Sequence, residues 1–282
     1  MKLLRHGPAN GERPGLVDLD GVVRDLSGII PDISGAILSP DSLADLRRTN
    51  LDGLPIIPAE TRLGPCVGAV GKFVCIGLNY RGHATESRMV LPTEPVIFMK
   101  ATSSISGAGD DIVLPPGSEK TDWEVELGVV IGSHAKYVEE QDALDHVAGF
   151  CVINDVSERA FQLDGTGQWV KGKSADTFGP VGPWLVTRDE LDWQNLELWL
   201  DVNGERRQSG ATRSMVFGVP FLVSYVSRFM TLQPGDVIAT GTPPGVALGA
   251  ADPVYLLAGD EVRLGITGLG EQRQRVRTYP LR

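Results

Sequence analysis

Two carboxylates stand two residues apart in a run that is otherwise apolar. The run Trp123-Glu124-Val125-Glu126-Leu127-Gly128-Val129-Val130-Ile131 has the composition of a buried strand, and alternate residues of a strand point to the same face. Two like charges that point together from an apolar strand repel one another unless a cation lies between them. Carboxylate oxygens suit Mg²⁺, Mn²⁺ or Ca²⁺. The pair therefore predicts a divalent-metal site, although the polar face of a half-exposed strand would show the same spacing.

A third carboxylate, Asp155, ends a second apolar run, Gly149-Phe150-Cys151-Val152-Ile153-Asn154. Ligand-binding side chains commonly lie at strand ends, where they converge over a sheet edge. We therefore predict Asp155 as the third metal ligand, with a turn or helix-capping aspartate as the simpler alternative. No histidine completes a zinc-type set, because His134 and His146 fall in a polar hairpin and a helix.

The segment Gly77-Leu78-Asn79-Tyr80-Arg81-Gly82-His83-Ala84-Thr85-Glu86 could carry an acid–base pair. If the chain turns helical after Asn79, His83 and Glu86 are three residues apart and share a helix face. A carboxylate beside an imidazole raises its basicity and fixes its tautomer, which a base that activates water requires. A surface pair on an exposed loop would have the same spacing.

Two further segments carry groups that could bind an anion. Lys171 and Lys173 lie in a glycine-flanked stretch with no helical pattern, and a lysine near a metal can bind a substrate carboxylate or stabilise an enolate oxygen. Residues 239–246 predict a tight turn whose amides and Thr242 hydroxyl could hold an anionic group. The simpler interpretations are solvated lysines and a structural turn.

These candidates need a scaffold of many short strands. The chain has 34 glycines and 19 prolines, too many for long uninterrupted helices, and from residue 72 apolar runs alternate with turns. Residues 202–205, Val-Asn-Gly-Glu, predict a hairpin. The expected fold class is mainly β (α+β), mostly antiparallel and rolled or barrel-like. Predicted strands cover residues 73–77, 96–100, 111–114, 124–131, 147–155, 185–187, 196–202, 237–240 and 261–266, and predicted helices cover 141–146 and 219–228.

The first 65 residues differ in pattern from the rest. Strand-like pieces at residues 2–4, 15–17 and 21–23 are divided by Asn-Gly and Asp-Gly turns. Ser39-Pro40-Asp41 matches the cap of a helix over residues 42–48. Proline-bearing segments at residues 54–58 and 64–65 then lead into the strand-rich region. We predict a small N-terminal β-rich domain over residues 1–65 and a catalytic domain over residues 70–282.

Composition excludes several kinds of partner. The 282 residues include 26 Lys and Arg against 36 Asp and Glu, a formal net charge of −10. Nucleic acids and anionic membranes need clustered positive charge, so neither is expected as a partner. The N-terminus lacks the apolar core of a signal peptide and no 18-residue apolar stretch occurs, which predicts a cytoplasmic protein. The three cysteines show no metal-type spacing and are expected to be buried as small hydrophobic residues.

In this order, the segments resemble the fumarylacetoacetate hydrolase superfamily over residues 70–280. Five separated motifs carry the resemblance, and five matches in order are far more specific than one. The region before residue 70 looks like the N-terminal extension of many bacterial members. The motifs are Gly77-Leu78-Asn79-Tyr80 followed by His83 and Glu86, Phe98-Met99-Lys100, Glu124-Val125-Glu126-Leu127-Gly128, Asn154-Asp155-Val156-Ser157, and Thr240-Gly241-Thr242-Pro243-Pro244-Gly245-Val246.

The resemblance implies a cofactor and a set of roles. The family's metal ligands fall on Glu124, Glu126 and Asp155, and its metal is usually Mg²⁺ or Mn²⁺. Its fold is a β-rich roll, and members are commonly homodimers. The remaining roles are a lid base and its partner acid at His83 and Glu86, a catalytic lysine at Lys173, and substrate-binding or site-ordering positions at Arg159, Gln162, Thr242 and Lys100.

The resemblance and the chemistry together predict metal-dependent hydrolysis of a carbon–carbon bond in a 2,4-dioxo acid. The substrate would be a small anionic oxo acid, an acylpyruvate or a diketo-deoxy sugar acid, and the products pyruvate and a carboxylic acid. Residues 77–89 would close over it as a lid. Specificity would depend on groups near the distal half of the substrate, among them Gln168, Trp169 and the segment after Glu86.

Other functions remain open. The same enolate chemistry serves decarboxylases of oxaloacetate and isomerases of hydroxy-dienedioates in this superfamily, and neither needs a base that activates water. Relatives with a similar N-terminal sequence include ureidoglycolate lyases. A metal-stabilised binding protein without catalytic activity is the remaining alternative, and the presence of both His83 and Glu86 counts against it.

Overall fold

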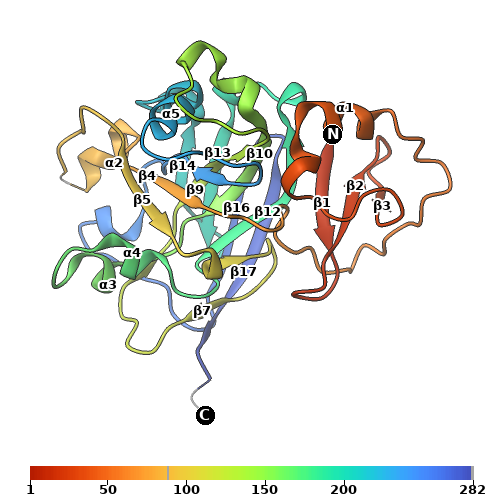
Figure 1. Cartoon of the computed structure of the whole chain (residues 1–282). Coiled ribbons are helices and arrows are strands. Elements are labelled where there is room, and N and C mark those ends of the chain that lie inside the picture. The colour runs from red at the N-terminus through yellow and green to blue at the C-terminus, as the bar shows by residue number, and fades with distance from the viewer. Residues whose placement is uncertain (88, 281–282) are drawn as a thin grey trace.

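Three β-sheets make up most of the framework in the part of the chain that the structure describes, residues 1–87 and 89–280 (Figure 1). The structure is a computed structural model. Residue 88 of the predicted lid and the last two residues of the predicted catalytic domain lie outside the described residues. The predominance of strands over short helices confirms the expected mainly β, α+β fold class.

The largest sheet contains the strands that carry the predicted carboxylates. Its ten described strands are β1 (Lys2–His6), β2 (Arg13–Val17), β3 (Val23–Asp25), β4 (Phe73–Gly77), β5 (Val96–Lys100), β6 (Ile105–Ser106), β9 (Val125–Ile131), β10 (Val147–Asn154), β12 (Gly179–Thr187) and β15 (Val237–Ala239). They pair in the order β3-β2-β1-β12-β10-β9-β15-β4-β5, with β6 beside β12. Within the described chain the two ends of this order do not pair, so the sheet is not a closed barrel.

A second sheet shares one apolar core with the first. Its five described strands are β7 (Ile112–Leu114), β13 (Glu197–Val202), β14 (Glu205–Ala211), β16 (Glu261–Ile266) and β17 (Gly270–Thr278). They pair in the order β14-β13-β16-β17-β7, and β8 (Thr121–Asp122) pairs with β11 (Ser157–Glu158) in a two-stranded piece. Pairing is mostly antiparallel, as predicted. The β13–β14 hairpin is also confirmed.

The helices are short. They are α1 (Pro40–Arg47), α2 (Arg81–Glu86), α3 (Arg159–Leu163), α4 (Trp169–Lys173) and α5 (Val219–Ser227), and the helix expected over residues 141–146 is a 3-10 helix, Glu140–His146. Ser39 caps α1 as predicted, because its side chain accepts a hydrogen bond from the Ser42 amide. In the described chain, no helix is long and apolar enough to cross a membrane. The three cysteines are buried, as predicted.

Two of the longest strands depart from the sequence pattern. β17 was not expected, because two of the three side chains buried on its inner face are polar, Gln272 and Gln274 beside Val276. Gln272 donates to the carbonyl oxygens of Val152 and Gly182, at 2.8 and 3.0 Å, and Gln274 donates to that of Ala108 at 3.0 Å. These hydrogen bonds replace the apolar contacts that an alternating pattern would reveal. β12 begins at residue 179 instead of 185, through a Gly-Pro-rich stretch that is typical of a loop.

Strands β9 and β10 cross the centre of the molecule and are buried on both faces. On one face, Val125 and Leu127 join a cluster that includes β13, β16 and α5. On the other face, Cys151 and Ile153 join a second cluster that includes α1. Because side chains alternate along a strand, residues 124, 126 and 155 belong to this second face. The predicted carboxylates therefore extend an apolar face at the point where the strands end.

The N-terminal strands continue the large sheet. β1 pairs antiparallel with β12, with Lys2 opposite Val186 and Leu3 opposite Leu185, and the N-terminal ammonium donates to the Thr187 hydroxyl at 2.7 Å. Figure 1 places β1–β3 and α1 on one side of the molecule and α2, α3 and α4 on the other. Residues 1–65 thus share a sheet with the rest of the chain, and the domain boundary near residue 65 stays a prediction.

Replacing a buried leucine of β1 tests whether this region unfolds with the whole chain. Leu3 is fully buried in the second cluster, so Leu3→Ala should destabilise the protein by about 2–5 kcal/mol and lower the temperature of one unfolding transition. Circular dichroism of the full chain measures this. Leu19→Ala, at an exposed leucine, should change stability by less than about 0.5 kcal/mol. If the protein shows two unfolding transitions and Leu3→Ala shifts just one of them, residues 1–65 unfold independently.

Candidate active site

The pairing of β9 with β10 brings the three predicted carboxylates together. Asn154 lies opposite Val125, and beyond this pair the Asp155 amide donates to the Glu124 carbonyl at 2.9 Å. Glu126 follows two residues along on the same face. One carboxylate oxygen from each side chain lies within 4.8 Å of the others, and all three side chains are buried. The carboxylates are therefore not the solvent-facing side of a strand.

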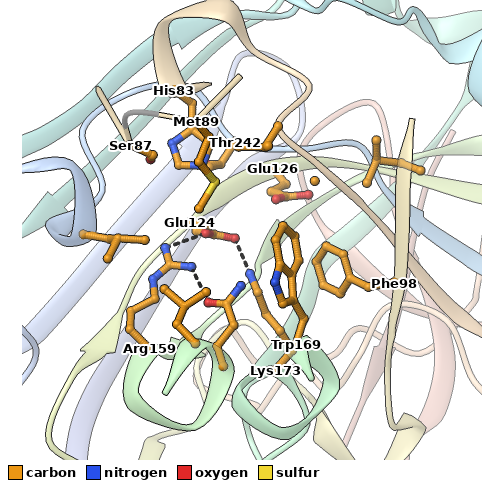
Figure 2. Close-up of a pocket in the computed structure, with 16 residues that line it drawn as sticks. His83, Ser87, Met89, Phe98, Glu124, Glu126, Arg159, Trp169, Lys173 and Thr242 are labelled. Atoms are coloured by element: carbon orange, nitrogen blue, oxygen red, sulfur yellow. Dashed lines mark hydrogen bonds and ion pairs between the residues drawn. The ribbon is translucent and has the colours of Figure 1, made fainter. Parts of the chain in front are cut away.

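Three buried cations face these carboxylates in the described chain. The Lys173 ammonium lies between Glu124 and Asp155, 2.6 Å from Oε2 of the first and 2.8 Å from Oδ2 of the second. Arg159 donates to the other Glu124 oxygen at 2.6 Å, as Figure 2 shows. Lys100 donates to the other Asp155 oxygen at 2.6 Å. Charges buried this deeply are tolerated only when they are paired in this way.

The ion pairs hold Glu124, Lys173 and Arg159 in their charged forms. Burial alone would raise the pKa of the Glu124 carboxyl, but Lys173 and Arg159 outweigh it and lower that pKa to about 2. Burial acts to lower the pKa of Lys173, yet Asp155 and Glu124 raise it overall. The pKa of Arg159 is likewise raised against the effect of burial by Glu124 and Asp122. The floor of the site is therefore a network of full charges at neutral pH.

Glu126 is the carboxylate that this network compensates least. Its Oε2 accepts a hydrogen bond from the Gly241 amide at 2.7 Å. Burial, followed by the charges of Asp155 and Glu124, raises the pKa of Glu126 well above its usual range. A divalent cation would offset this repulsion through three hard oxygen donors. Because each carboxylate oxygen has two lone pairs, an oxygen that accepts from a lysine can also bind a metal. The donor set therefore suits a divalent metal.

A one-turn helix places Lys173, and the expectation of no helix around Lys171 and Lys173 is wrong. Helix α4 packs closely against α3, and Gly172 permits this contact. A Cβ at Gly172 would lie 2.5 Å from the Glu158 carbonyl oxygen and 2.5 Å from the Gln162 Cβ. A single turn is too short to display a helical period, so only its packing reveals it. Lys171, by contrast, is exposed.

The predicted acid–base pair lies on α2, in the lid. The helix expected after Asn79 is confirmed, and His83 Nδ1 lies 3.0 Å from Glu86 Oε1. Glu86 Oε2 accepts from the Gly245 amide at 2.8 Å, which holds this carboxylate in place. His83 is buried, so the two residues are not a surface pair. With Nδ1 held by Glu86, Nε2 is the ring nitrogen left to act on a substrate.

The predicted turn at residues 239–246 binds a side chain of the protein, Glu126, instead of a separate anionic ligand. Gly241 has a φ of +98°, a conformation that favours glycine, and its amide binds the Glu126 carboxylate. The Thr242 hydroxyl donates to the Val125 carbonyl at 2.9 Å and accepts from Gln208 at 2.8 Å. Thr242 therefore orders the loop against β9 as well as lining the pocket.

Asp122 is a site residue that the sequence analysis missed. Its Oδ2 accepts from Arg159 Nε at 2.9 Å and from the Leu248 amide at 3.0 Å, and its Oδ1 accepts from the Ala247 amide at 2.8 Å. It therefore orients Arg159 and anchors the loop that follows residue 246. The sequence did contain a sign of this role. Asp122 precedes Glu124 by two residues, the same spacing that separates Glu124 from Glu126.

Most of the site residues line one pocket, with a cavity volume of about 30 Å³ (Figure 2). A cavity of this size holds only one or two water molecules, so residues that line it must shift to admit a substrate. The lining residues that were predicted to bind metal or substrate, or to act in catalysis, are His83, Glu124, Glu126, Arg159, Gln162, Lys173 and Thr242. The apolar lining consists of Ile76, Leu78, Met89, Phe98, Leu163, Trp169 and Leu248.

Lys100 differs from the other predicted substrate-binding residues. Its ammonium is completely buried and donates to Asp155 and to the Val156 carbonyl, at 2.6 and 3.0 Å. It is not among the described residues that line the pocket. These contacts orient Asp155, and a direct contact with substrate stays a prediction. Gln162, which also lines the pocket, accepts from Arg159 at 2.9 Å.

The sequence and fold match those of a known enzyme family. Residues 72–277 match the family described as fumarylacetoacetate (FAA) hydrolase, C-terminal. This match covers well over half of the chain, and the chain therefore belongs to the fumarylacetoacetate hydrolase family.

Particular relatives include hydrolases and isomerases. A Burkholderia multivorans protein named only as a hydrolase is 61% identical over 279 residues, 98% of this chain and 99% of its own. The solved structure of 2-hydroxyhepta-2,4-diene-1,7-dioate isomerase from Mycobacterium marinum is 33% identical, with a TM-score of 0.80 and 100% of both chains covered. That of maleylpyruvate hydrolase from Sphingobium sp. SYK-6, in complex with manganese(II) and pyruvate, is 31% identical, with a TM-score of 0.83 and coverage of 99% of this chain and 100% of its own.

Glu126→Gln should strengthen the metal-free fold and weaken metal binding. Burial, Asp155 and Glu124 oppose ionisation of Glu126, so folding at neutral pH must take up a proton at this carboxyl. Gln removes this cost, so with chelator present the variant should unfold at a higher temperature than the wild type. It also removes a ligand, so calorimetry should find Mn²⁺ affinity lowered by more than about 10-fold. Added Mn²⁺ should therefore raise the unfolding temperature of the wild type far more than that of the variant.

A glutamate outside the site provides the matched control. Glu119 is exposed, and Glu119→Gln should change neither the metal-free unfolding temperature nor the Mn²⁺ affinity. Wild-type Mn²⁺ affinity in Glu126→Gln would contradict the assignment of the three carboxylates as the metal site.

Proposed function

We propose that the protein is a divalent-metal-dependent hydrolase that cleaves the C3–C4 bond of a 2,4-dioxo acid, giving pyruvate and a carboxylic acid. The observation that carries the proposal is buried His83, which lines the same pocket as Glu124 and Glu126 and is held by Glu86 at 3.0 Å. Hydrolysis needs a base that activates water, whereas enolate chemistry alone does not. Family membership supports an enzyme, and the relative solved with manganese(II) and pyruvate supports an oxo acid as ligand.

The carboxylate and 2-keto oxygen of the substrate would bind at the charged end of the pocket. When bound by Glu124, Glu126 and Asp155, Mg²⁺ or Mn²⁺ would supply a Lewis acid toward these two oxygens. Gln162 accepts from Arg159 through Oε1, which leaves its Nε2 group available to donate to a substrate oxygen. The same orientation directs the 4-carbonyl toward the lid.

Attack by water on C4 would depend on the lid pair. His83 Nε2 takes a proton from water as the water oxygen bonds to C4, and Glu86 stabilises the resulting imidazolium through Nδ1. The Gly245 amide fixes Glu86 at 2.8 Å, so the imidazole keeps one orientation during proton transfer. A nearly closed pocket keeps other water away from the reacting carbons.

Cleavage would follow from the tetrahedral carbon. The C3–C4 bond breaks, C4 leaves as the carboxylic acid, and the electron pair remains on C3 as the enolate of pyruvate. Lys173, buried and charged beside Glu124 and Asp155, lies where this negative charge develops. The His83 imidazolium returns its proton to C3, pyruvate leaves, and the base is restored.

His83→Gln should abolish hydrolysis and leave the metal site intact. The variant lacks a base, so kcat for pyruvate release from an acylpyruvate should fall by about 10²–10⁴-fold, while Mn²⁺ affinity stays that of the wild type. Thr85 is exposed on the same helix, and Thr85→Ala is the matched control, which should retain activity. Wild-type turnover in His83→Gln would refute the role of the lid pair.

Removal of metal should stop turnover without unfolding the chain. Lys100, Lys173 and Arg159 already face two of the three carboxylates, so the metal-free protein should keep its far-ultraviolet circular dichroism. Exhaustive chelation should abolish the loss of enol absorbance of the substrate, and Mg²⁺ or Mn²⁺ should restore it. Full activity in the chelated protein would exclude a metal-dependent reaction.

The second candidate function is an isomerase or decarboxylase that uses the enolate alone. The buried Lys173 beside Glu124 and Asp155 favours it, because this arrangement can stabilise an enolate without the lid pair, and one solved relative is named as an isomerase. A screen with Mg²⁺ should therefore include oxaloacetate, a hydroxy-dienedioate and ureidoglycolate. Turnover of one of these that survives His83→Gln would favour this second class. No turnover of any substrate would favour a binding protein.

A further inference from the structure

Beside the carboxylates, part of the same pocket has an apolar lining, which we call the slot. Trp169 and Phe98 form one wall, with ring centroids 5.3 Å apart and planes at 68°. The Trp169 ring packs directly on the backbone of β4, because a Cβ at Gly77 would come within 2.7 Å of it. In Figure 2, Met89 projects from the lid segment toward the carboxylate end. The slot is completed by Leu163 and Leu248.

The polar groups near this slot are neutral or already paired. The Ser87 hydroxyl, which lines the pocket, is shielded from solvent and has no hydrogen-bond partner among the described residues. Among the described lining residues, the side chains that can carry positive charge are His83, Arg159 and Lys173, and each faces a carboxylate of the protein. The slot therefore presents apolar surface and a neutral hydroxyl to the distal end of a ligand.

We propose that this slot selects 2,4-dioxo acids whose acyl group is neutral and apolar, and that Met89 and Trp169 are specificity-determining residues. The inference rests on the proposed function, which puts the pyruvate half at the carboxylates and C4 beneath His83. The acyl chain then runs between the Met89 thioether and the Trp169 ring. The unbranched, flexible methionine can close on a short alkyl chain. A terminal carboxylate would lose its water here, and the Ser87 hydroxyl cannot offset its charge.

Two ligands that differ only at their far end test the slot without turnover. 2-Oxoheptanoate and 2-oxoheptanedioate both carry the metal-binding 2-oxo acid group, and neither has the 4-carbonyl that hydrolysis requires. Calorimetry with the Mg²⁺-loaded protein should give a Kd at least about 10-fold lower for 2-oxoheptanoate, because an unpaired buried carboxylate is strongly disfavoured. Equal affinities, or tighter binding of the diacid, would overturn the inference.

Charged substitutions at Met89 and at its neighbour test whether Met89 sets the preference for a neutral acyl group. Met89→Lys should shift the ratio of the two Kd values toward the diacid by about 10-fold or more, because it brings a cation beside the acyl chain. Met89→Leu should keep the wild-type ratio. Val90 is the next residue and is 89% exposed, so Val90→Lys adds the same charge outside the slot and should leave the ratio unchanged. An equal shift in Met89→Lys and Val90→Lys would overturn the role of Met89.

Turnover separates this inference from the proposed function. 2,4-Dioxoheptanoate and 2,4-dioxoheptanedioate have the same length and differ by a terminal methyl or carboxylate. A kcat/KM at least about 10-fold higher for the first supports both proposals. Cleavage of both with equal kcat/KM supports the hydrolase and refutes the slot preference. If neither is cleaved while the ratio of Kd values favours 2-oxoheptanoate, the hydrolase proposal fails and the slot preference stands.

Discussion

Three carboxylates buried within 4.8 Å of one another are the constraint on which the rest of the site depends. Like charges this close in a protein interior stay ionised only if cations face them. Each of the facing cations comes from a different element: Lys100 ends β5, Arg159 begins α3 and Lys173 ends α4. These elements must therefore meet at one point over the ends of β9 and β10. The close α3–α4 packing at Gly172 and the buried ion pairs are two aspects of the same requirement.

One loop, residues 240–249, connects the two ends of the proposed chemistry. The Gly241 amide binds Glu126, and the Gly245 amide binds Glu86. Gly249 leaves room for the Glu86 side chain, since a Cβ there would lie 2.6 Å from it. The distance between the lid base and the carboxylates is thus set by a single segment, not by the lid alone. In the proposed function, the charged end of the pocket binds the reacting atoms of the substrate. The apolar slot beside it contacts the distal acyl group and selects among substrates.

Most strands could be predicted from sequence because they are short apolar runs bounded by turns, and β4 and β5 begin and end as predicted. The failures have a common physical cause. β17 buries Gln272 and Gln274, which satisfy their amides through carbonyl groups of other strands, and α4 is a single turn held by α3. Asp122 was missed although it continues the period of two that revealed the ligand pair. For β17 and α4, a long-range contact and not a local period gives the residues their place.

The sequence by itself determined which residues share a face over short distances. The spacing of Glu124 with Glu126, and of His83 with Glu86, follows from strand and helix geometry and needs no other part of the chain. Only the tertiary structure decided that Asp155 meets the first pair, and that buried His83 lines one pocket with Glu124 and Glu126. It also decided that Lys100 contacts Asp155 beneath the pocket. The reason is physical: residues tens of positions apart meet through strand register and helix packing, which the burial of the whole core selects.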